Sequence, residues 1–373
     1  MEPQLELAQE TGASKRLLGM TRNPVTGLIL ALVCMLPFAA FGVFEGMTVV
    51  SWIGILLVVW LAVENGGNDV SKGVAPLVTS GAVGELGALI YGSLITAAGS
   101  ILSIYVSMKL LKLFTAGLID PKFVVTGGMV LAMAAGASLW VALATRFSWP
   151  VSTTHAIVGA VLAVGCIAFG ASGVMWSNIG NKVIVPLLFS PVVGLAVSWA
   201  LSFVIEMLRI PEGAGKATAW VSSGAVCFVR ALNDTPKIVG IAVLTAFSTL
   251  SDLDETKLFP IFLLITVAMT AGSLIKGYNV LQLLSKKVSK MNNSGSTAAV
   301  LATAVLVSLS SKLGWPVSTT HVSTTAIIGS GLRQGKDGVN WGVVREMALS
   351  WVITLPAAGV FAAVVYGGYL LFS

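Results

Sequence analysis

Apolar stretches long enough, or nearly long enough, to cross a lipid bilayer follow one another along almost the whole of this 373-residue chain. A helix needs roughly 20 apolar residues to cross the hydrocarbon core. The stretches lie at about 24–44, 48–63, 86–114, 123–146, 153–171, 183–208, 217–232, 258–284, 297–313, 317–332 and 343–372. Strands would leave backbone groups unpaired in lipid, so we expect helices. We therefore predict an all-α polytopic membrane protein with about 10–12 membrane segments.

The charge content agrees with a lipid environment. Only 10% of the residues are charged, whereas a typical soluble domain has about 25%. Part of the net charge of +6 comes from short connections such as the one carrying Lys286, Lys287 and Lys290. Such clusters suit lipid headgroups and do not indicate nucleic-acid binding. We predict a multi-pass protein of the cell membrane, with the polar residues 1–22 as an aqueous N-terminal tail.

A heptapeptide occurs twice in the chain. Trp-Pro-Val-Ser-Thr-Thr-His stands at 149–155 and again, identically, at 315–321. An Asn-Asp pair precedes each copy at a similar distance, at 68–69 and 233–234. The shared order and spacing indicate two homologous halves, which we place at 23–212 and 213–373. If the halves run in opposite directions through the membrane, they form two inverted structural repeats with the paired motifs near the midplane.

Each copy of the heptapeptide has the composition of a helix start inside the membrane. Pro150 should end the preceding helix, and a new helix should begin at Ser152. The first turn of a helix has free N–H groups and a partial positive charge, and the hydroxyls of Ser152, Thr153 and Thr154 add neutral donors. Two such starts facing each other would surround a tetrahedral oxyanion. The alternative is that these hydroxyls bond back to carbonyls one turn earlier.

The two aspartates, Asp69 and Asp234, lie in otherwise apolar surroundings. A carboxylate at membrane depth costs about 3 kcal/mol, so it should face a cavity and hold a cation or a proton. We expect the neighbouring Gly66, Gly67 and Gly73 to let the helix unwind and offer carbonyl oxygens to Na⁺. Asp69 and Asp234 are therefore the candidate metal ligands if the bound cation is sodium.

An alternative role for the aspartates is structural. Lys72 and Lys237 each follow an aspartate by three residues and lie on the same helical face, where they can form an ion pair. If both carboxylates instead share a cavity with an anion, a positive charge has to lie between them. Charge balance thus predicts that anion and cation binding are coupled.

The only two histidines, His155 and His321, end the two heptapeptides. We expect a supporting, hydrogen-bonded role, with a proton carrier or an anion donor as the alternative. A competing class is an intramembrane hydrolase with Ser152 as nucleophile and His155 as base, or a metal enzyme with two His and two Asp ligands. An exact duplication explains a single asymmetric catalytic centre poorly, so we predict a transporter without cofactors and not an enzyme. A passive anion channel is a further alternative.

With these residues in view, the chain resembles the inorganic phosphate transporter (PiT) family of cation-coupled phosphate symporters. The motifs that carry the resemblance lie at about 66–80, 147–160, 230–242 and 313–325. The resemblance implies inverted repeats with broken helices and re-entrant hairpins, alternating access and a homodimer in the lipid bilayer. It also implies phosphate binding and cation binding by two sets of residues. The phosphate set is Ser152, Thr153, Thr154, Ser318, Thr319 and Thr320; the cation set is Asn68, Asp69, Asn233 and Asp234.

The sequence departs from the family pattern at Lys72, where the first Asn-Asp motif usually has asparagine. Lys237 is a common residue in the second motif. Lysines beside the cation site can weaken Na⁺ binding or neutralise the anion, so the coupling ion stays open between Na⁺ and H⁺. Sulfate or another oxyanion is the alternative substrate, because the hydroxyl cradle has no feature that excludes it.

Overall fold

The computed structural model describes residues 21–208, 212–246, 255–287 and 293–372. Within these ranges the chain is built from helices and has no strands. By length and composition seven segments can cross a membrane, and α2 (Pro24–Ala40) and α7 (Thr153–Phe169) are shorter apolar helices. The seven are α3 (Val49–Thr79), α4 (Glu85–Val106), α6 (Gly127–Arg146), Trp176–Met207, Leu258–Lys276, Ser294–Leu313 and α15 (Trp341–Phe372). The prediction of an all-α multi-pass membrane protein is confirmed.

Two further helices, α10 (Glu212–Ala246) and α14 (Thr319–Leu332), carry the polar motifs of the second half. Together with the seven spans and the two shorter apolar helices, they bring the described candidate membrane segments to eleven, within the predicted 10–12. Of the predicted aqueous tail, only Thr21 and Arg22 lie within the described residues. The rest of that prediction falls outside them.

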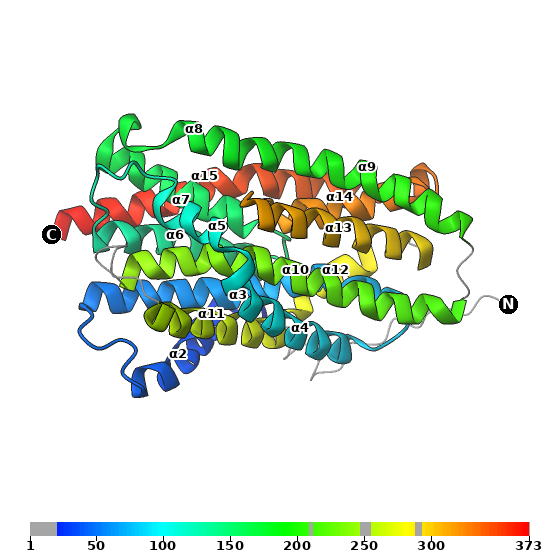
Figure 1. Cartoon of the computed structure of the whole chain (residues 1–373), viewed down its shortest axis with the longest axis horizontal. Coiled ribbons are helices and arrows are strands. Elements are labelled where there is room, and N and C mark those ends of the chain that lie inside the picture. The colour runs from blue at the N-terminus through cyan, green and yellow to red at the C-terminus, as the bar shows by residue number, and fades with distance from the viewer. Residues whose placement is uncertain (1–20, 209–211, 247–254, 288–292, 373) are drawn as a thin grey trace.

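The order of elements repeats. The first half runs α3, α4, α5 (Met108–Ala116), α6, α7, a 3₁₀ turn η1 (Ala171–Gly173), and a long segment of α8 (Trp176–Asn178), the π-helical η2 (Ile179–Ile184) and α9 (Val185–Met207). The second half runs α10, α11 (Glu255–Lys276), α12 (Tyr278–Lys287), α13 (Asn293–Leu313), α14, a 3₁₀ turn η4 (Lys336–Gly338) and α15. In Figure 1 the equivalent helices α9 and α15 run in opposite directions along the long axis. This is the arrangement that an inverted repeat requires.

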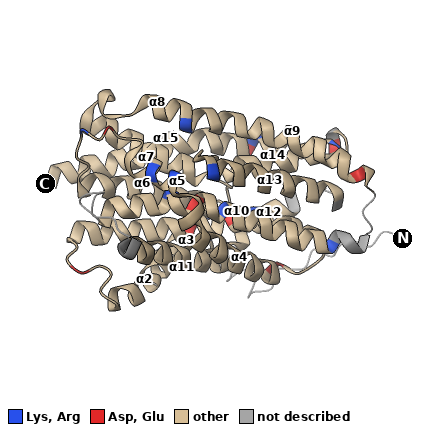
Figure 2. Cartoon of the chain, viewed as in Figure 1, with Lys and Arg blue, Asp and Glu red and all other residues tan. Residues whose placement is uncertain are grey.

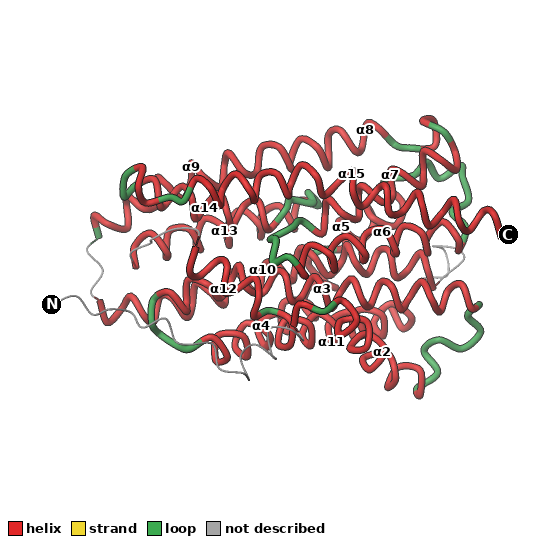
Figure 3. The backbone as a smooth tube through the Cα atoms, turned by 180° about the vertical axis from the view of Figure 1, so that it is seen from behind, coloured by secondary structure: helices red, strands yellow, loops and turns green. Residues whose placement is uncertain are grey.

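Two helical hairpins, α6–α7 and α13–α14, occupy different ends of the bundle (Figure 1). We call residues 147–152 tip 1 and residues 314–318 tip 2. Figure 3 shows short loops that interrupt the helices inside the bundle, away from its two ends. Backbone outside a helix is tolerated at membrane depth only where protein or a polar cavity surrounds it. The breaks therefore mark the interior of the bundle as the polar region.

The two tips begin with the same backbone turn. Ser148 (φ 60°) and Gly314 (φ 79°) both adopt the left-handed conformation. In tip 1 the N–H of Ser148 donates to Thr145 O and that of Trp149 to Ala144 O, which is a Schellman motif. The prediction that Pro150 ends the helix was wrong in position, because α6 already ends at Arg146 through this motif. The proline only prevents the chain from resuming a helix before Ser152.

The expected unwinding at Gly66 and Gly67 was also wrong. Helix α3 is continuous from Val49 to Thr79. A Cβ on Gly66 would lie 2.1 Å from Met269 O, and one on Gly272 of α11 would lie 2.0 Å from Val63 O. These glycines let α3 and α11 pack backbone to backbone, as small residues do between membrane helices. Gly73 is likewise helical and faces Cys227 Sγ, which a Cβ would approach to 2.5 Å.

Candidate functional site

The new helix of each hairpin begins where the sequence predicts. Ser152 is the N-cap of α7, and its Oγ accepts from His155 N at 3.3 Å. Ser318 is the N-cap of α14, and its Oγ accepts from His321 N at 3.2 Å. Each serine thus caps its own helix. The two N-termini, with their partial positive charge, lie at the polar centre of the bundle.

The asparagines of the Asn-Asp motifs hold the hairpin tips. Asn68 Nδ2 donates to Trp149 O at 2.8 Å, and Val151 N donates to Asn68 Oδ1 at 3.2 Å. In the second half, Asn233 Nδ2 donates to Val317 O at 3.0 Å. Both amides therefore satisfy backbone groups that the broken helices leave free. Their role as cation ligands stays a prediction.

The two lysines connect the hairpins crosswise. Lys72 donates to Val151 O of tip 1 at 3.2 Å and to Thr320 Oγ1 of the opposite hairpin. Lys237 donates to Val317 O of tip 2 at 3.1 Å and to Thr154 Oγ1 of the opposite hairpin at 2.6 Å. Each ammonium group thus bridges one tip and the first turn of the other hairpin. Lys237 therefore repeats the contacts of Lys72 with the roles of the two halves exchanged.

The aspartates lie next to these lysines. Asp69 forms an ion pair with Lys72, and Asp234 pairs with Lys237 at 3.0 Å. The ion pairs considered as the structural alternative are therefore present. Thr319 Oγ1 lies 3.2 Å from Asp69 Oδ2 and 3.4 Å from Asp234 Oδ2, so one hydroxyl is shared between the two carboxyl groups. The site thus brings both aspartates together.

The remaining threonines complete the connection between the halves. Asn65 Nδ2 donates to Thr153 Oγ1 at 2.8 Å, and Thr320 Oγ1 donates to Val151 O of tip 1 at 2.6 Å. These threonine hydroxyls bond to other elements of the structure. The alternative that they only bond back to their own helix therefore does not describe Thr153, Thr319 or Thr320.

Two site residues were missed by the sequence analysis. Asn65 lies four residues before Asp69 and also donates to its Oδ2 at 3.4 Å. Arg230 lies four residues before Asp234 at the equivalent place, is 1% exposed, and acts electrostatically on Asp69. Its Nη2 donates to Thr96 and Ser273 at 2.7 and 3.1 Å. The sequence feature that could have identified them is a polar residue one helical turn before each aspartate. Because Asn65 and Arg230 are of different types, they do not form a repeated motif.

The histidine rings lie against each other across the pair of hairpins. The ring centroids of His155 and His321 are 4.6 Å apart, and His321 also packs on Trp351 at 4.2 Å. Their contacts place them behind the threonines, at the joint between α7 and α14. Nδ1 of His155 and both ring nitrogens of His321 have no hydrogen-bond partner among the described residues, so the expected hydrogen-bonded support is not observed and the role of the histidines stays a prediction.

A third buried ion pair lies outside this arrangement. Glu64 pairs with Lys276 of α11 and accepts from Trp60 Nε1 at 3.0 Å. The two side chains are fully buried. Although Glu64 is only five residues from Asp69, its partners lie on α3 and α11 and not on the hairpins.

The site is closed and has an excess of positive charge. The six hydroxyl residues are all buried, as are both aspartates and both lysines. In their ordinary charge states Lys72, Lys237 and Arg230 carry three positive charges against two on Asp69 and Asp234. Figure 2 shows charged residues along the helices at mid-length of a bundle that is otherwise mostly uncharged. Chemically, the arrangement offers ammonium groups, hydroxyls and helix N-termini to one anion.

The metal-enzyme alternative finds no support in this geometry. Among the residues that the structure describes, no three His, Cys, Asp or Glu side chains come close enough to hold a metal ion together. The two histidine rings pack against each other, and His321 also packs on Trp351.

Comparison with known proteins places the chain among transporters. The family model described as the phosphate transporter family matches residues 65–219 and 210–362. A "probable low-affinity inorganic phosphate transporter" of Mycobacterium bovis is 29% identical over 324 residues, covering 84% of this chain and 76% of the relative. Its namesake in Bacillus subtilis is 26% identical and covers 81% and 92%, respectively. A solved structure entitled "The sodium-dependent phosphate transporter" matches with a TM-score of 0.75 at 22% identity, over 87% of this chain and all of the other.

Proposed function

The chain belongs to the phosphate transporter family, and on that premise we propose that it is a symporter that moves inorganic phosphate across the cell membrane. Phosphate is held between the first turns of α7 and α14, by Ser152, Thr153, Thr154, Ser318, Thr319 and Thr320. The cation that drives transport acts at Asp69 and Asp234, with Asn68 and Asn233 beside them. The family is one of transporters and not of enzymes.

The observation that carries this proposal is the crosswise contact of the lysines. Lys72 and Lys237 each direct an ammonium group at a threonine of the opposite hairpin, Thr320 and Thr154. An ammonium is a strong donor to phosphate oxygens. A phosphate that replaces these threonine hydroxyls as the acceptor keeps both ammonium groups hydrogen-bonded. The threonine hydroxyls can then donate to the phosphate as well. The excess positive charge favours an anion in the same place.

The closed tips support alternating access. Tip 1 is held by Asn68 and Lys72, and tip 2 by Asn233 and Lys237. The hairpins occupy different ends of the bundle (Figure 1), so loosening one tip at a time would expose the site to one side at a time. Two inverted repeats provide such a pair of equivalent gates. The homodimer concerns a second copy of the chain and stays a prediction.

Of the two coupling ions, the geometry favours the proton. The ammonium groups of Lys72 and Lys237 already occupy Asp69 Oδ1 and Asp234 Oδ1, where a sodium ion would coordinate. The continuous helix at Gly66 and Gly67 offers no unwound carbonyls to replace that coordination. A proton needs only one carboxylate oxygen, and Thr319 Oγ1 lies within 3.4 Å of both Asp69 Oδ2 and Asp234 Oδ2. Sodium is the second candidate.

Labelled phosphate uptake into proteoliposomes tests the proposal. Wild-type protein is reconstituted, a pH gradient and a Na⁺ gradient are imposed separately, and sulfate is added as competitor. We expect an inwardly directed proton gradient to drive accumulation, with little response to Na⁺; inhibition by sulfate as strong as by unlabelled phosphate would show that the site accepts oxyanions in general. Flux that ignores both gradients would show a passive anion channel and overturn the symport mechanism.

Asp69→Asn and Asp234→Asn test the cation site. Each is expected to abolish gradient-driven uptake while the protein still inserts into the membrane, because the substitution removes the group that carries the coupling cation. Insertion is checked by size-exclusion chromatography and thermal unfolding. Normal uptake by both variants would remove the aspartates from the mechanism.

A further inference from the structure

A basic pocket lies against the outer face of tip 2. It has a volume of about 430 Å³ and is lined by Lys109 and Lys112 of α5, Asn178 and Lys182 of the α8–η2 segment, and Gly314 and Trp315 of the tip. Within the described residues none of the three lysines forms an ion pair with a carboxylate. Three ammonium groups thus face one cavity without counter-charges.

The position of this pocket makes its charge significant. In Figure 2 Lys and Arg positions, coloured blue on the ribbon, lie near the label of α5, at mid-length of the bundle. A lysine at the depth of the bilayer centre costs about 2.5–3.5 kcal/mol when it faces lipid. Three of them around one cavity are therefore explained by a polar occupant. Lys182 also belongs to a π-helical turn, a feature often found at functional sites.

Tip 2 separates this pocket from the central site by a few residues. Gly314 and Trp315 line the pocket, while the carbonyl of Val317 accepts from Lys237 inside the site. A Cβ on Gly314 would lie 2.8 Å from Lys109 Cβ, so the tip packs directly on α5. One short strip of backbone thus has the basic pocket on one side and the phosphate cradle on the other.

The pocket breaks the symmetry between the two halves. In the order of elements, Lys109 and Lys112 of α5 correspond to Asn279 and Gln282 of α12, and Lys182 corresponds to Met347 of α15. None of these counterparts is charged. The lysines of α12, Lys286 and Lys287, lie instead at the C-terminal end of that helix.

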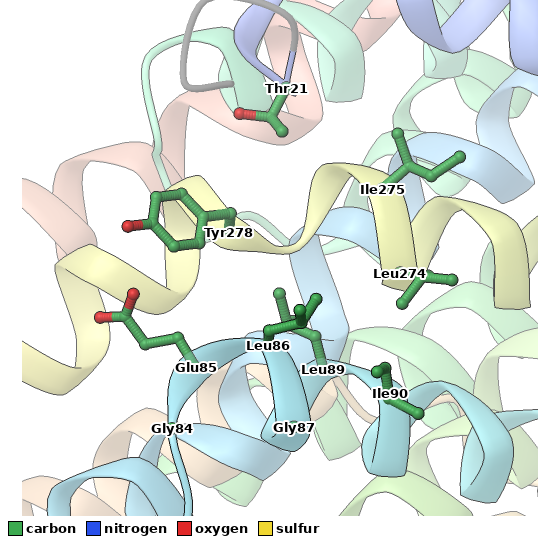
Figure 4. Close-up of a pocket in the computed structure, with 10 residues that line it drawn as sticks. All are labelled: Thr21, Gly84, Glu85, Leu86, Gly87, Leu89, Ile90, Leu274, Ile275 and Tyr278. Carbon is green, nitrogen blue, oxygen red and sulfur yellow. The ribbon is translucent and has the colours of Figure 1, made fainter. Parts of the chain in front are cut away.

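A further cavity near α12 differs in character, and no residue of tip 1 lines it. A cavity of about 710 Å³ lies between α4 and the junction of α11 and α12, and Glu85 is its one charged lining residue. Figure 4 shows Leu86, Leu89 and Ile90 of α4 facing this space together with Leu274 and Ile275 of α11. Its apolar walls and single carboxylate are unsuited to an anion.

We propose that the basic pocket at tip 2 is a second binding site for a phosphate group. Lys109, Lys112 and Lys182 bind its oxygens as point charges, and Asn178 lies beside them as a polar wall residue. The phosphate group is that of inorganic phosphate or of an anionic lipid headgroup. If it is inorganic phosphate, the pocket loads the central site from this side; that loading role rests on the proposed function, whereas the binding does not.

Lysine acetylation read by peptide mass spectrometry tests the binding. Purified protein in detergent is treated with an amine-reactive acetylating reagent in sodium phosphate or in sodium chloride of equal ionic strength. We expect phosphate to slow acetylation of Lys109, Lys112 and Lys182 several-fold. Lys122 is the matched control, since its side chain is 85% exposed and lies outside the pocket. The measurement is repeated in Asp69→Asn, so that a failure of the transport mechanism does not affect the result.

A second arm distinguishes the sources of the phosphate group. The protein is placed in nanodiscs of phosphatidylcholine with or without phosphatidylglycerol, in chloride buffer. Protection by inorganic phosphate supports the proposal with the substrate as occupant, and protection by phosphatidylglycerol alone supports it with a lipid headgroup. In Lys109→Gln/Lys112→Gln the remaining Lys182 should lose its protection. Acetylation rates that neither anion changes, or equal protection of Lys122, would overturn the proposal.

Discussion

At the scale of single residues, the site depends on two lysines that each satisfy three partners. Lys72 contacts Asp69, Val151 and Thr320, and Lys237 makes the equivalent contacts in the second half. Removing one member of a buried ion pair leaves an unpaired charge, which typically costs about 3–5 kcal/mol. If the site binds an anion as proposed, the lysines connect the stability of the closed site with its affinity for that anion.

Lys72→Gln should lower both thermal stability and phosphate uptake, because Asp69 is left buried without its partner. The double variant Lys72→Gln/Asp69→Asn removes the unpaired charge and should recover most of the stability but none of the uptake. Differential scanning fluorimetry and proteoliposome uptake check the two effects. Lys122→Gln is the control, since its exposed pair with Asp120 contributes little. A Lys72→Gln protein as stable and active as the wild type would contradict the account.

The duplicated residues of the site could be predicted from the sequence, and the contacts between the halves could not. An identical heptapeptide and the paired Asn-Asp motif indicated that the hydroxyls and aspartates lie together. Which threonine each lysine meets depends on how the opposite hairpin packs, and no local pattern encodes that. Arg230 was overlooked because its counterpart in the other repeat is the neutral Asn65.

At the scale of helices and hairpins, backbone geometry places the site. The Schellman turns at Ser148 and Gly314 aim the two tips into the bundle, and close glycine packing holds α3 against α11. The proline predicted the helix breaks but misplaced the ends of the first helices, whereas the hairpins were implied by the family resemblance. A serine in the left-handed conformation gives no signal of its own, because only glycine is typical there.

Ser148→Gly should stabilise the protein by about 1 kcal/mol, because glycine adopts a positive φ without the steric cost that serine carries. Gly314→Ala should destabilise it by a similar amount or more, since the new Cβ also meets Lys109. Thermal unfolding in detergent measures both. Opposite signs in the two tips are expected, and a loss of stability in Ser148→Gly would contradict this description of tip 1.

Gly66→Ala should separate α3 from α11. The added Cβ would lie 2.1 Å from Met269 O, a backbone atom that cannot move alone, so we expect a loss of several kcal/mol in the free energy of unfolding, as for other overpacked or strained sites. Gly367→Ala in α15 is the matched control, because a Cβ added there would have no heavy atom within 4 Å. Equal melting temperatures of the two variants would show that the helices do not depend on this close approach.

At the scale of the whole molecule, two equivalent sets of helices surround one site near the middle of the bundle. The composition and the apolar stretches were sufficient to predict the membrane location and the helical class. The repeated motifs predicted two halves, and the opposite course of α9 and α15 in Figure 1 agrees with their inversion. The repeat boundaries at 212 and 213 stay a prediction. What distinguishes the halves, above all the basic pocket at tip 2, arises from positions where the repeat has diverged and became visible only from the structure.

The central claim is that both hairpins hold the same phosphate ion, and direct binding tests it. The affinity for labelled phosphate is measured by equilibrium dialysis on purified wild type, Thr154→Val and Thr320→Val. Thr303→Val is the control, a buried threonine of α13 whose hydroxyl donates to Ala299 O of its own helix. Each hairpin variant should weaken binding about 10- to 100-fold, the loss expected for one hydrogen bond to a charged group, while the control binds as the wild type. Wild-type affinity in either hairpin variant would show that the hairpins do not share the anion.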